Sequence, residues 1–236
     1  MSVSFDFSGD VVLVTGVGGA LGSAVAEAFL DSGATVCGAD LVDSESEDFL
    51  LDDPDRIDFY QGDFTDEAQV VAAIEDIVDS HGGLDALVNI AGTWRGGNPV
   101  EETEVETFDF LFDVNLKTMF LATKHALPHL REREGAVVSV SARSSLEGGE
   151  GDAIYRATKA GVRILTESVA EENLGEVRAN AVMPSVIDTP MNREMMPDSD
   201  FSEWVTPDDI ADVMQFLCSD AASVTSGAAV PVYGEV

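Results

Sequence analysis

Short apolar runs alternate along the chain with stretches in which apolar residues recur at helical spacing. The first run, residues 11–14, is apolar throughout and rich in valine, which is typical of a strand buried on both faces of a parallel sheet. Further strands are predicted at 34–40, 57–61, 84–90, 136–141, 177–183 and 228–233. Helices are predicted between them at 21–33, 67–80, 103–125, 153–172 and 206–219. This order predicts an α/β fold, a doubly wound parallel sheet between two helix layers, as a single three-layer domain over residues 1–236.

Two helix starts carry their own signals. Thr103 followed by Glu106 resembles a capping box and predicts the start of a long helix that runs towards residue 125. Thr206, Pro207 and Asp209 predict a second capped start.

Glycines follow the first strand in the sequence VVLVTGVGGALG. Gly16, Gly19 and Gly22 have no Cβ, so the backbone can turn sharply and approach a phosphate closely. The next helix begins here, and its first amides, including that of Leu21, are unpaired and carry the positive end of the helix dipole. The turn therefore predicts a pyrophosphate site, although glycine turns also make purely structural strand-to-helix connections.

Two carboxylates follow the next predicted strands. Asp40 ends the second strand, roughly 20 residues after the glycine turn, where a carboxylate can accept both hydroxyls of an adenosine ribose. It would repel a 2′-phosphate, and Val17 in the turn is not basic, so NAD is favoured over NADP. Asp63 is expected to end the third strand and to accept the adenine amino group. In so acidic a chain, a solvated Asp is the alternative for both.

Tyr155 and Lys159 lie four residues apart at the start of a predicted helix, so both side chains project from one face. A free tyrosine has a pKa of about 10, and lowering it to about 7 requires roughly 4 kcal/mol of preferential phenolate stabilisation. One cation at about 4 Å and an effective dielectric near 20 supplies that much. Tyr155 is then expected to act as general acid or base while hydride moves to or from a nicotinamide. An ordinary exposed Tyr and Lys pair is the alternative.

Charge restricts the partners. The formal net charge is −33, from 45 acidic and 12 basic residues, which argues against nucleic acid or an anionic membrane as partner. Lys117, Lys124 and Lys159 are the only lysines, a skew that resembles proteins of salt-loving organisms. At molar salt the Debye length falls to about 3 Å, so self-repulsion is screened. Cys37 and Cys218 are expected to be reduced. With no leader or membrane-spanning run in the sequence, we expect a soluble cytoplasmic protein.

Together these motifs resemble the short-chain dehydrogenases/reductases over nearly the whole chain. The family's glycine motif is similar to residues 15–22, with Ala20 in place of the middle glycine, and its NNAG motif is similar to residues 89–92. The resemblance implies a Rossmann-type fold and a proton relay through Asn115. It also implies a helix-packed homotetramer or homodimer. The implied cofactor-binding residues are Gly16, Gly19, Leu21, Gly22, Asp40, Asp63, Phe64, Asn89, Ala91, Gly92, Tyr155, Lys159, Pro184, Ile187 and Thr189.

One position departs from the family. Its catalytic Ser precedes the Tyr by thirteen residues, and Ala142 stands there. Alternation along the strand sends Ser141 to the opposite face, so Ser144 is the better substitute if its loop turns inward. The segment also resembles that of dihydropteridine reductases, which have Ala at this position. The expected catalytic residues are Asn115, Tyr155, Lys159 and Ser144.

The remaining candidates are weaker. No metal site is expected, and His81, His125 and His129 are taken as surface or helix-end residues. A short substrate lid is expected at about 190–205, and Trp94 and Arg95 are candidates for the substrate side. The sequence thus favours an NAD(H)-dependent oxidoreductase acting on a small ketone, 3-oxoacyl, sugar or pterin-like substrate. A non-catalytic dinucleotide-binding regulatory or scaffold protein of the same fold is the alternative.

Overall fold

The computed structural model describes residues 4–235 and contains a sheet of seven parallel strands. Their order across the sheet is β3-β2-β1-β4-β5-β6-β7. The strands are β1 (Val11–Thr15), β2 (Thr35–Asp40), β3 (Asp58–Gln61), β4 (Ala86–Asn89), β5 (Ala136–Val140), β6 (Arg178–Pro184) and β7 (Ala229–Val232). The order reverses between β1 and β4, which is the switch point of a doubly wound sheet. The predicted fold is confirmed, with strand ends shifted by one or two residues.

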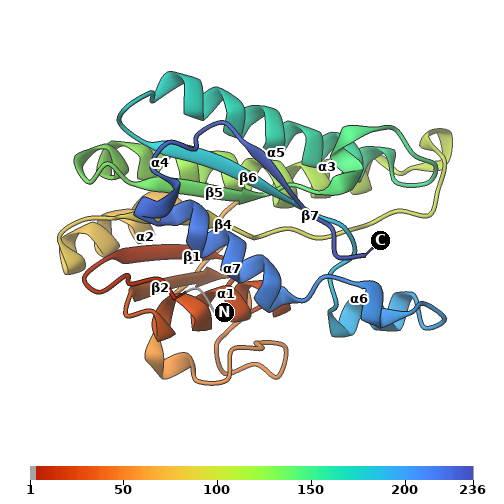
Figure 1. Cartoon of the computed structure of the whole chain (residues 1–236). Helices are drawn as coiled ribbons and strands as arrows, with labels where there is room; N and C mark the ends of the chain where they lie inside the picture. The colour runs from red at the N-terminus through yellow and green to blue at the C-terminus, as the bar shows by residue number, and fades with distance from the viewer. Residues whose placement is uncertain (1–3, 236) are drawn as a thin grey trace.

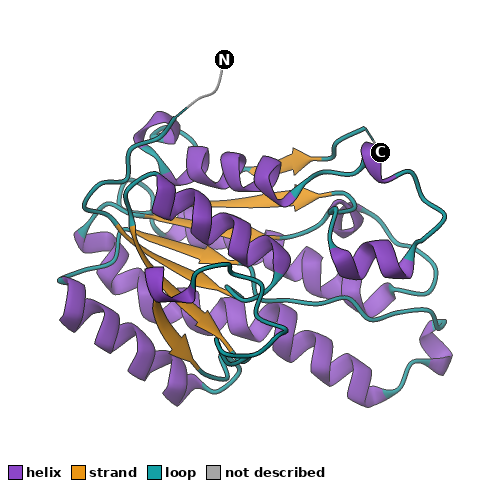
Figure 2. Ribbon diagram, turned by 90° about the horizontal axis from the view of Figure 1, so that it is seen from below, coloured by secondary structure: helices purple, strands orange, loops and turns teal. Residues whose placement is uncertain are grey.

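Helices cover both faces of the sheet (Figures 1 and 2). They are α1 (Ala20–Asp31), α2 (Glu67–His81), α3 (Val105–Phe112), α4 (Thr118–Glu132), α5 (Ala153–Glu172), α6 (Pro190–Met195) and α7 (Pro207–Cys218). Alternate side chains of β1 enter two separate cores: Val12 and Val14 pack with the α1 and α7 side chains, whereas Val11 and Leu13 pack with those of α2, α4 and α5. This two-sided burial explains why the strands are apolar without alternation.

The long helix expected after residue 103 differs from the prediction at its start. Thr103 lies outside it, because its hydroxyl donates to the Pro99 carbonyl at 3.0 Å. Glu104 is the N-cap of α3, and no side chain caps that helix, so the predicted box with Glu106 is wrong. Thr206 and Asp209, by contrast, do form a capping box at the start of α7.

A wide π-helical turn, Asp113–Lys117, joins α3 to α4. Such turns hold one extra residue and are frequent at functional sites. Asn115 lies at its centre and is buried. A regular helical pattern predicts continuity here, so the sequence did not reveal the turn.

The segment between β6 and α7 contains a small element outside the two helix layers. Helix α6 lies beyond one end of the sheet, on the side where the chain ends (Figure 1). Within the described range 4–235, every helix is too short or too polar to cross a membrane.

Candidate active site

All seven strands are parallel, so their carboxyl ends meet at one edge, and most of the predicted site residues lie there. Thr15, Asp40 and Asn89 are the last residues of β1, β2 and β4, and Pro184 is the last of β6. Asp63 follows β3 by two residues rather than ending it, which corrects the expected strand boundary. The crevice outside such an edge is where open α/β sheets bind ligands.

The glycine turn between β1 and α1 is built so closely that side chains are excluded. Gly16 has φ +73°, and a Cβ on it would lie 2.8 Å from the Ala91 backbone. A Cβ on Gly22 would lie 2.0 Å from the Gly16 carbonyl oxygen. Gly19 is the N-cap of α1 and no side chain caps this helix, so the first-turn amides, that of buried Leu21 among them, have no partner within the helix. This arrangement fits a diphosphate.

Asp40 is held against the glycine turn. One carboxylate oxygen accepts from the Gly18 amide at 2.9 Å and the other from the Val42 amide at 3.0 Å. Asp63 accepts from the Thr65 amide at 2.9 Å and its hydroxyl at 2.7 Å, and Phe64 beside it is buried. Both carboxylates therefore have fixed positions at the sheet edge, as a site for adenosine requires.

The loop after β4 is fastened to the glycine turn. The Thr15 hydroxyl oxygen accepts from the amides of Ile90 and Ala91 at 3.2 and 3.3 Å. The Asn89 side chain points elsewhere, since it donates to Thr123 at 3.1 Å and Ser139 at 3.3 Å. A contact between residue 89 and a dinucleotide would thus come from the backbone.

Asn115 and Lys159 meet beside Gly92. A Cβ on Gly92 would lie 2.9 Å from Asn115 Oδ1 and 3.2 Å from Lys159 Nζ. The Asn115 amide accepts from the Thr93 amide at 2.7 Å and donates to the Thr93 carbonyl at 2.9 Å. Lys159 is buried, and its ammonium donates to the Val140 carbonyl at 2.9 Å. Three chain segments are therefore joined at this point by buried polar groups.

Thr158 contributes a link that the sequence analysis missed. It is fully buried, accepts from Asn115 Nδ2 at 3.2 Å and donates to the Tyr155 carbonyl at 2.7 Å. Asn115 is in this way connected to the helical turn that carries Tyr155. Only its position beside Lys159 in the YRATK segment could have indicated it.

The electrostatics at Tyr155 differ from the expectation. Burial raises the pKa of its phenol to about 12, the charge of Asp152 adds to this, and Arg156 opposes it. Burial also lowers the pKa of Lys159 to about 8. The predicted lowering of the phenol pKa by Lys159 is not what this geometry gives, because desolvation of the phenolate outweighs the nearby cations. At neutral pH the phenol is therefore protonated.

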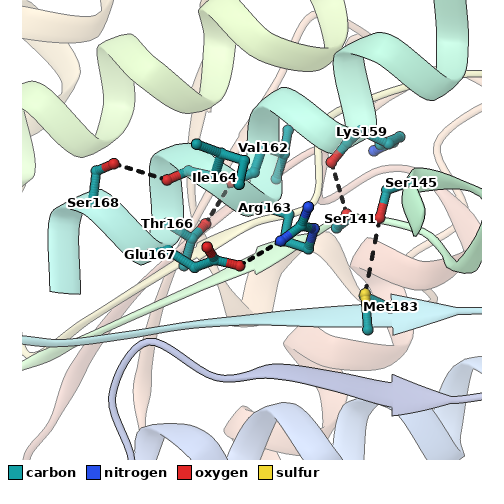
Figure 3. Close-up of polar contacts among 10 residues, drawn as sticks. All are labelled: Ser141, Ser145, Lys159, Val162, Arg163, Ile164, Thr166, Glu167, Ser168 and Met183. Carbon is teal, nitrogen blue, oxygen red and sulfur yellow. Dashed lines mark hydrogen bonds and ion pairs between the residues drawn. The ribbon is translucent and has the colours of Figure 1, made fainter. Parts of the chain in front are cut away.

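The serines near Ala142 lie in three different environments. Ser141 is buried, and its hydroxyl donates to the Lys159 carbonyl at 2.8 Å (Figure 3). Ser145 is buried and contacts the Met183 sulfur at 3.9 Å (Figure 3). Ser144 is partly exposed, on the short 3-10 turn that follows Ala142. Of the three hydroxyls, only that of Ser144 is left for a substrate.

The segment after β6 starts with Pro184 and leads into α6. Ile187 forms a bridge with Val205, and the Thr189 hydroxyl caps α6 by accepting from the Asn192 amide at 3.2 Å. Trp204 is buried against Phe201, with ring centroids 4.8 Å apart, so it packs on the core rather than covering a ligand.

A cavity of about 330 Å³ lies at the start of α5, where Ile154, the residue before Tyr155 in the sequence, lines it. It is lined by Trp94, Arg95, Asn98, Ile154 and Met195, among others. Trp94 and Arg95, which the sequence analysis named as candidates for the substrate side, both line this cavity. A second cavity, of about 360 Å³, lies between β3 and α2. None of the predicted catalytic residues Asn115, Ser144, Tyr155 and Lys159 lines either cavity.

Comparison with known proteins identifies the family. The family model described as enoyl-(acyl carrier protein) reductase matches residues 16–234. A 3-oxoacyl-[acyl-carrier-protein] reductase, FabG, from Thermotoga maritima is 34% identical, over 96% of this chain and 97% of its own length. A solved structure titled short-chain dehydrogenase/reductase, glucose/ribitol dehydrogenase, from Brucella melitensis has a TM-score of 0.90 at 30% identity, covering 98% of both chains. The chain belongs to the short-chain dehydrogenase/reductase family.

As a short-chain dehydrogenase/reductase, the protein is an oxidoreductase that moves a hydride between a nicotinamide dinucleotide and a small carbonyl or alcohol compound. A further solved member, ElxO with NADP bound, has a TM-score of 0.87 at 29% identity, over 95% of this chain and 97% of its own. The scaffold alternative gains no support from these relatives, whose names denote reductases and dehydrogenases.

Proposed function

We propose that this short-chain dehydrogenase/reductase is an NAD(H)-dependent carbonyl reductase or alcohol dehydrogenase in which Tyr155 transfers the proton. The observation that carries the proposal is the meeting of Asn115 and Lys159 beside Gly92, one helical turn from Tyr155. The dinucleotide supplies the hydride when it is bound. Tyr155 donates its phenolic proton to the carbonyl oxygen, and the Lys159 ammonium stabilises the phenolate that remains. Asn115 holds the loop at Thr93 in register with α5, and Ser144 orients the carbonyl in part.

The preference for NAD follows from the charge around Asp40. The first basic residue of the chain is Arg56, and it pairs with Asp31 at 3.0 Å rather than with a ligand site. The Asp40 carboxylate, fixed on the glycine turn, has lone pairs free for two ribose hydroxyls. A 2′-phosphate would meet this carboxylate with no cation from the first 55 residues to offset the repulsion.

The cavity at the start of α5 supports a small, partly apolar substrate. Trp94 and Met195 offer apolar surface, whereas Asn98 and Arg95 offer hydrogen-bond donors. The guanidinium of Arg95 lies 3.6 Å from the centroid of the Phe110 ring, which holds it in place. Because α6 carries Met195 at the cavity, we assign the lid to residues 190–205. A ketone, 3-oxoacyl thioester, sugar or pterin-like compound fits this description.

Turnover of a carbonyl panel tests the function. The chain is incubated in molar KCl with NADH or NADPH and with a diketone, a 3-oxoacyl thioester, an aldose and a quinonoid dihydropterin. We expect NADH oxidation with at least one compound, with kcat/KM at least about tenfold higher for NADH than for NADPH. NADH binding without turnover across the panel would favour the scaffold alternative. Equal kcat/KM for NADH and NADPH would contradict the role of Asp40 in selecting NAD but would leave the oxidoreductase function standing.

The two reaction directions are expected to respond oppositely to pH. Alcohol oxidation needs the phenolate of Tyr155, whose pKa is raised to about 12. At pH values below that pKa, the fraction of phenolate increases about tenfold for each unit by which the pH rises. Reduction needs the neutral phenol and the Lys159 ammonium, whose pKa burial lowers to about 8. Steady-state kcat/KM from pH 6 to 10 should therefore rise for oxidation and decline for reduction above about pH 8. An oxidation rate independent of pH would contradict this assignment.

Stability is expected to depend on salt. The net charge of −33 produces self-repulsion that dilute buffer does not screen, and most of the 45 carboxylates have no basic residue to pair with. We expect Tm to rise by about 10 °C between dilute buffer and molar KCl. Thermal unfolding is measured in KCl and in an equal concentration of a neutral osmolyte. The osmolyte does not screen charge, so a gain in Tm seen only in KCl is due to charge screening and not to exclusion of solute from the protein surface. A Tm and an activity unchanged by KCl would remove the salt-adapted interpretation.

Self-association and location complete the proposal. Phe108, Phe120 and Ile164 are exposed on α3, α4 and α5, which supports a homotetramer or homodimer packed through these helices. Cys37 and Cys218 are both free thiols, which supports a reducing compartment such as the cytoplasm.

A further inference from the structure

Three different metal-binding side chains converge at the outer part of the sheet, away from the crevice. Cys37 lies in β2, Asp58 is the first residue of β3, and His81 is the last residue of α2. One ligand atom from each, the Cys sulfur, a carboxylate oxygen and an imidazole nitrogen, lie within 4.8 Å of one another. His81 Nε2 and Asp58 Oδ2 are 3.1 Å apart.

The backbone fixes this convergence. Cys37 and Asp58 are direct partners in the parallel register of β2 and β3, so their side chains leave neighbouring strands at the same level. Helix α2 ends at His81 because Gly82 adopts the left-handed conformation, φ +77°. The carbonyl end of a helix dipole favours a cation there. The group is thus set by sheet register and a helix end rather than by flexible loops.

We infer that Cys37, Asp58 and His81 form a binding site for one divalent transition-metal ion of the zinc class. Three protein ligands from S, N and O donors, with a fourth position open to solvent, match the coordination that zinc accepts. Two ligands at about 2.1 Å in tetrahedral geometry lie about 3.4 Å apart, close to the spacing of His81 and Asp58.

A metal ion can reach this position from solvent, and the proton that the Cys37 thiol loses on binding it can leave to solvent. The Cys37 side chain is buried, whereas 57% of the Asp58 side chain and 21% of the His81 side chain are exposed, so the ion reaches the thiol from their side. Burial raises the pKa of the Cys37 thiol to about 12, and the charges of Asp58 and Asp76 add to this. The entering dication replaces the thiol proton, which leaves to solvent as the sulfur–metal bond forms.

The place of the site in the fold indicates a structural role. It lies towards the amino ends of the strands, whereas the proposed catalytic residues lie at their carboxyl ends. Strand β3 is the edge strand and only four residues long. A metal ion would join it to β2 and to α2, and thereby stabilise the side of the sheet that carries Asp63.

Cobalt(II) gives the direct test, because a thiolate–cobalt bond produces a charge-transfer band in the near ultraviolet that carboxylates do not. The reduced, chelator-treated full chain is titrated with Co²⁺ in molar KCl, and a band saturating at about one ion per chain is expected. Cys37→Ala should lose the band and the matched variant Cys218→Ala should keep it. His81→Gln should weaken Co²⁺ binding at least about tenfold, and His129→Gln should not.

Zn²⁺ at about 100 times its Kd should also raise the Tm of the parent chain by about 5 °C. The same concentration should not raise the Tm of Asp58→Asn. That variant changes a largely exposed side chain, so it serves if Cys37→Ala does not fold. The proposal is overturned if Co²⁺ produces no sulfur-to-metal band. It is also overturned if the band survives in Cys37→Ala and the Zn²⁺-dependent gain in Tm survives in Asp58→Asn. His81 and Asp58 would then be an ordinary ion pair beside a buried thiol.

Discussion

Tyr155→Phe is expected to lower kcat for carbonyl reduction by about 10³-fold while NADH affinity changes little. The substitution keeps the ring and its packing on α5 and removes only the hydroxyl. That hydroxyl is the proton donor in the proposed reaction, with a pKa raised by burial to about 12. Steady-state kinetics and NADH fluorescence titration measure the two quantities separately.

A matched variant separates the proton donor from general effects of losing a phenol. Tyr60 is on β3, and its hydroxyl donates to Asp76 at 3.0 Å, so Tyr60→Phe should leave kcat essentially unchanged. Ser144→Ala should cost much less than Tyr155→Phe, because Ser144 is only a partial substitute for the serine that Ala142 replaces. Equal large losses at residues 144 and 155 would contradict that ranking. Full activity in Tyr155→Phe would contradict the mechanism itself.

Gly22→Ala is expected to destabilise the fold by about 3 kcal/mol and to lower NADH affinity at least about tenfold. The new methyl group would lie 2.0 Å from the Gly16 carbonyl oxygen, so α1 must move away from the turn. That movement displaces the first-turn amides proposed to hold the diphosphate. Unfolding by denaturant in molar KCl measures the first effect, and fluorescence titration measures the second.

Gly148→Ala is the control for this substitution. A Cβ on Gly148 meets nothing within 4 Å, so this variant should unfold and bind NADH like the parent chain. Gly22→Ala with the parent's unfolding midpoint and affinity would show that the turn yields easily. Its role as a rigid diphosphate site would then fail.

The strand and helix pattern predicted the architecture because the inner strands, such as β1, are buried on both faces, which leaves apolar runs such as residues 11–14. The site edge was predictable for the same reason, since parallel strands place Asp40 and Asn89 at one side. The glycine turn was predictable because only glycine fits at Gly16 and Gly22.

Other features depend on contacts that no local pattern carries. The capping box at Thr103 failed because the Pro99 carbonyl takes its hydroxyl. The phenol pKa of Tyr155 was misjudged because the cost of burial is set by the surrounding fold. Cys37, Asp58 and His81 are far apart in the chain, and only the pairing of β2 with β3 and the end of α2 unite them.

The extra residue in the π-helical turn at 113–117 lets the side chains of α3 and those of α4 face different directions, although the two helices are continuous. Each residue of an α-helix advances the direction of its side chains by about 100°, so one added residue offsets α3 from α4 by that angle. Phe108, whose ring stacks on that of Phe112 at 4.4 Å, is exposed at the surface, while Asn115 is buried in the interior. Changes on the outer surface of α3 can therefore accumulate without disturbing the buried Asn115 amide.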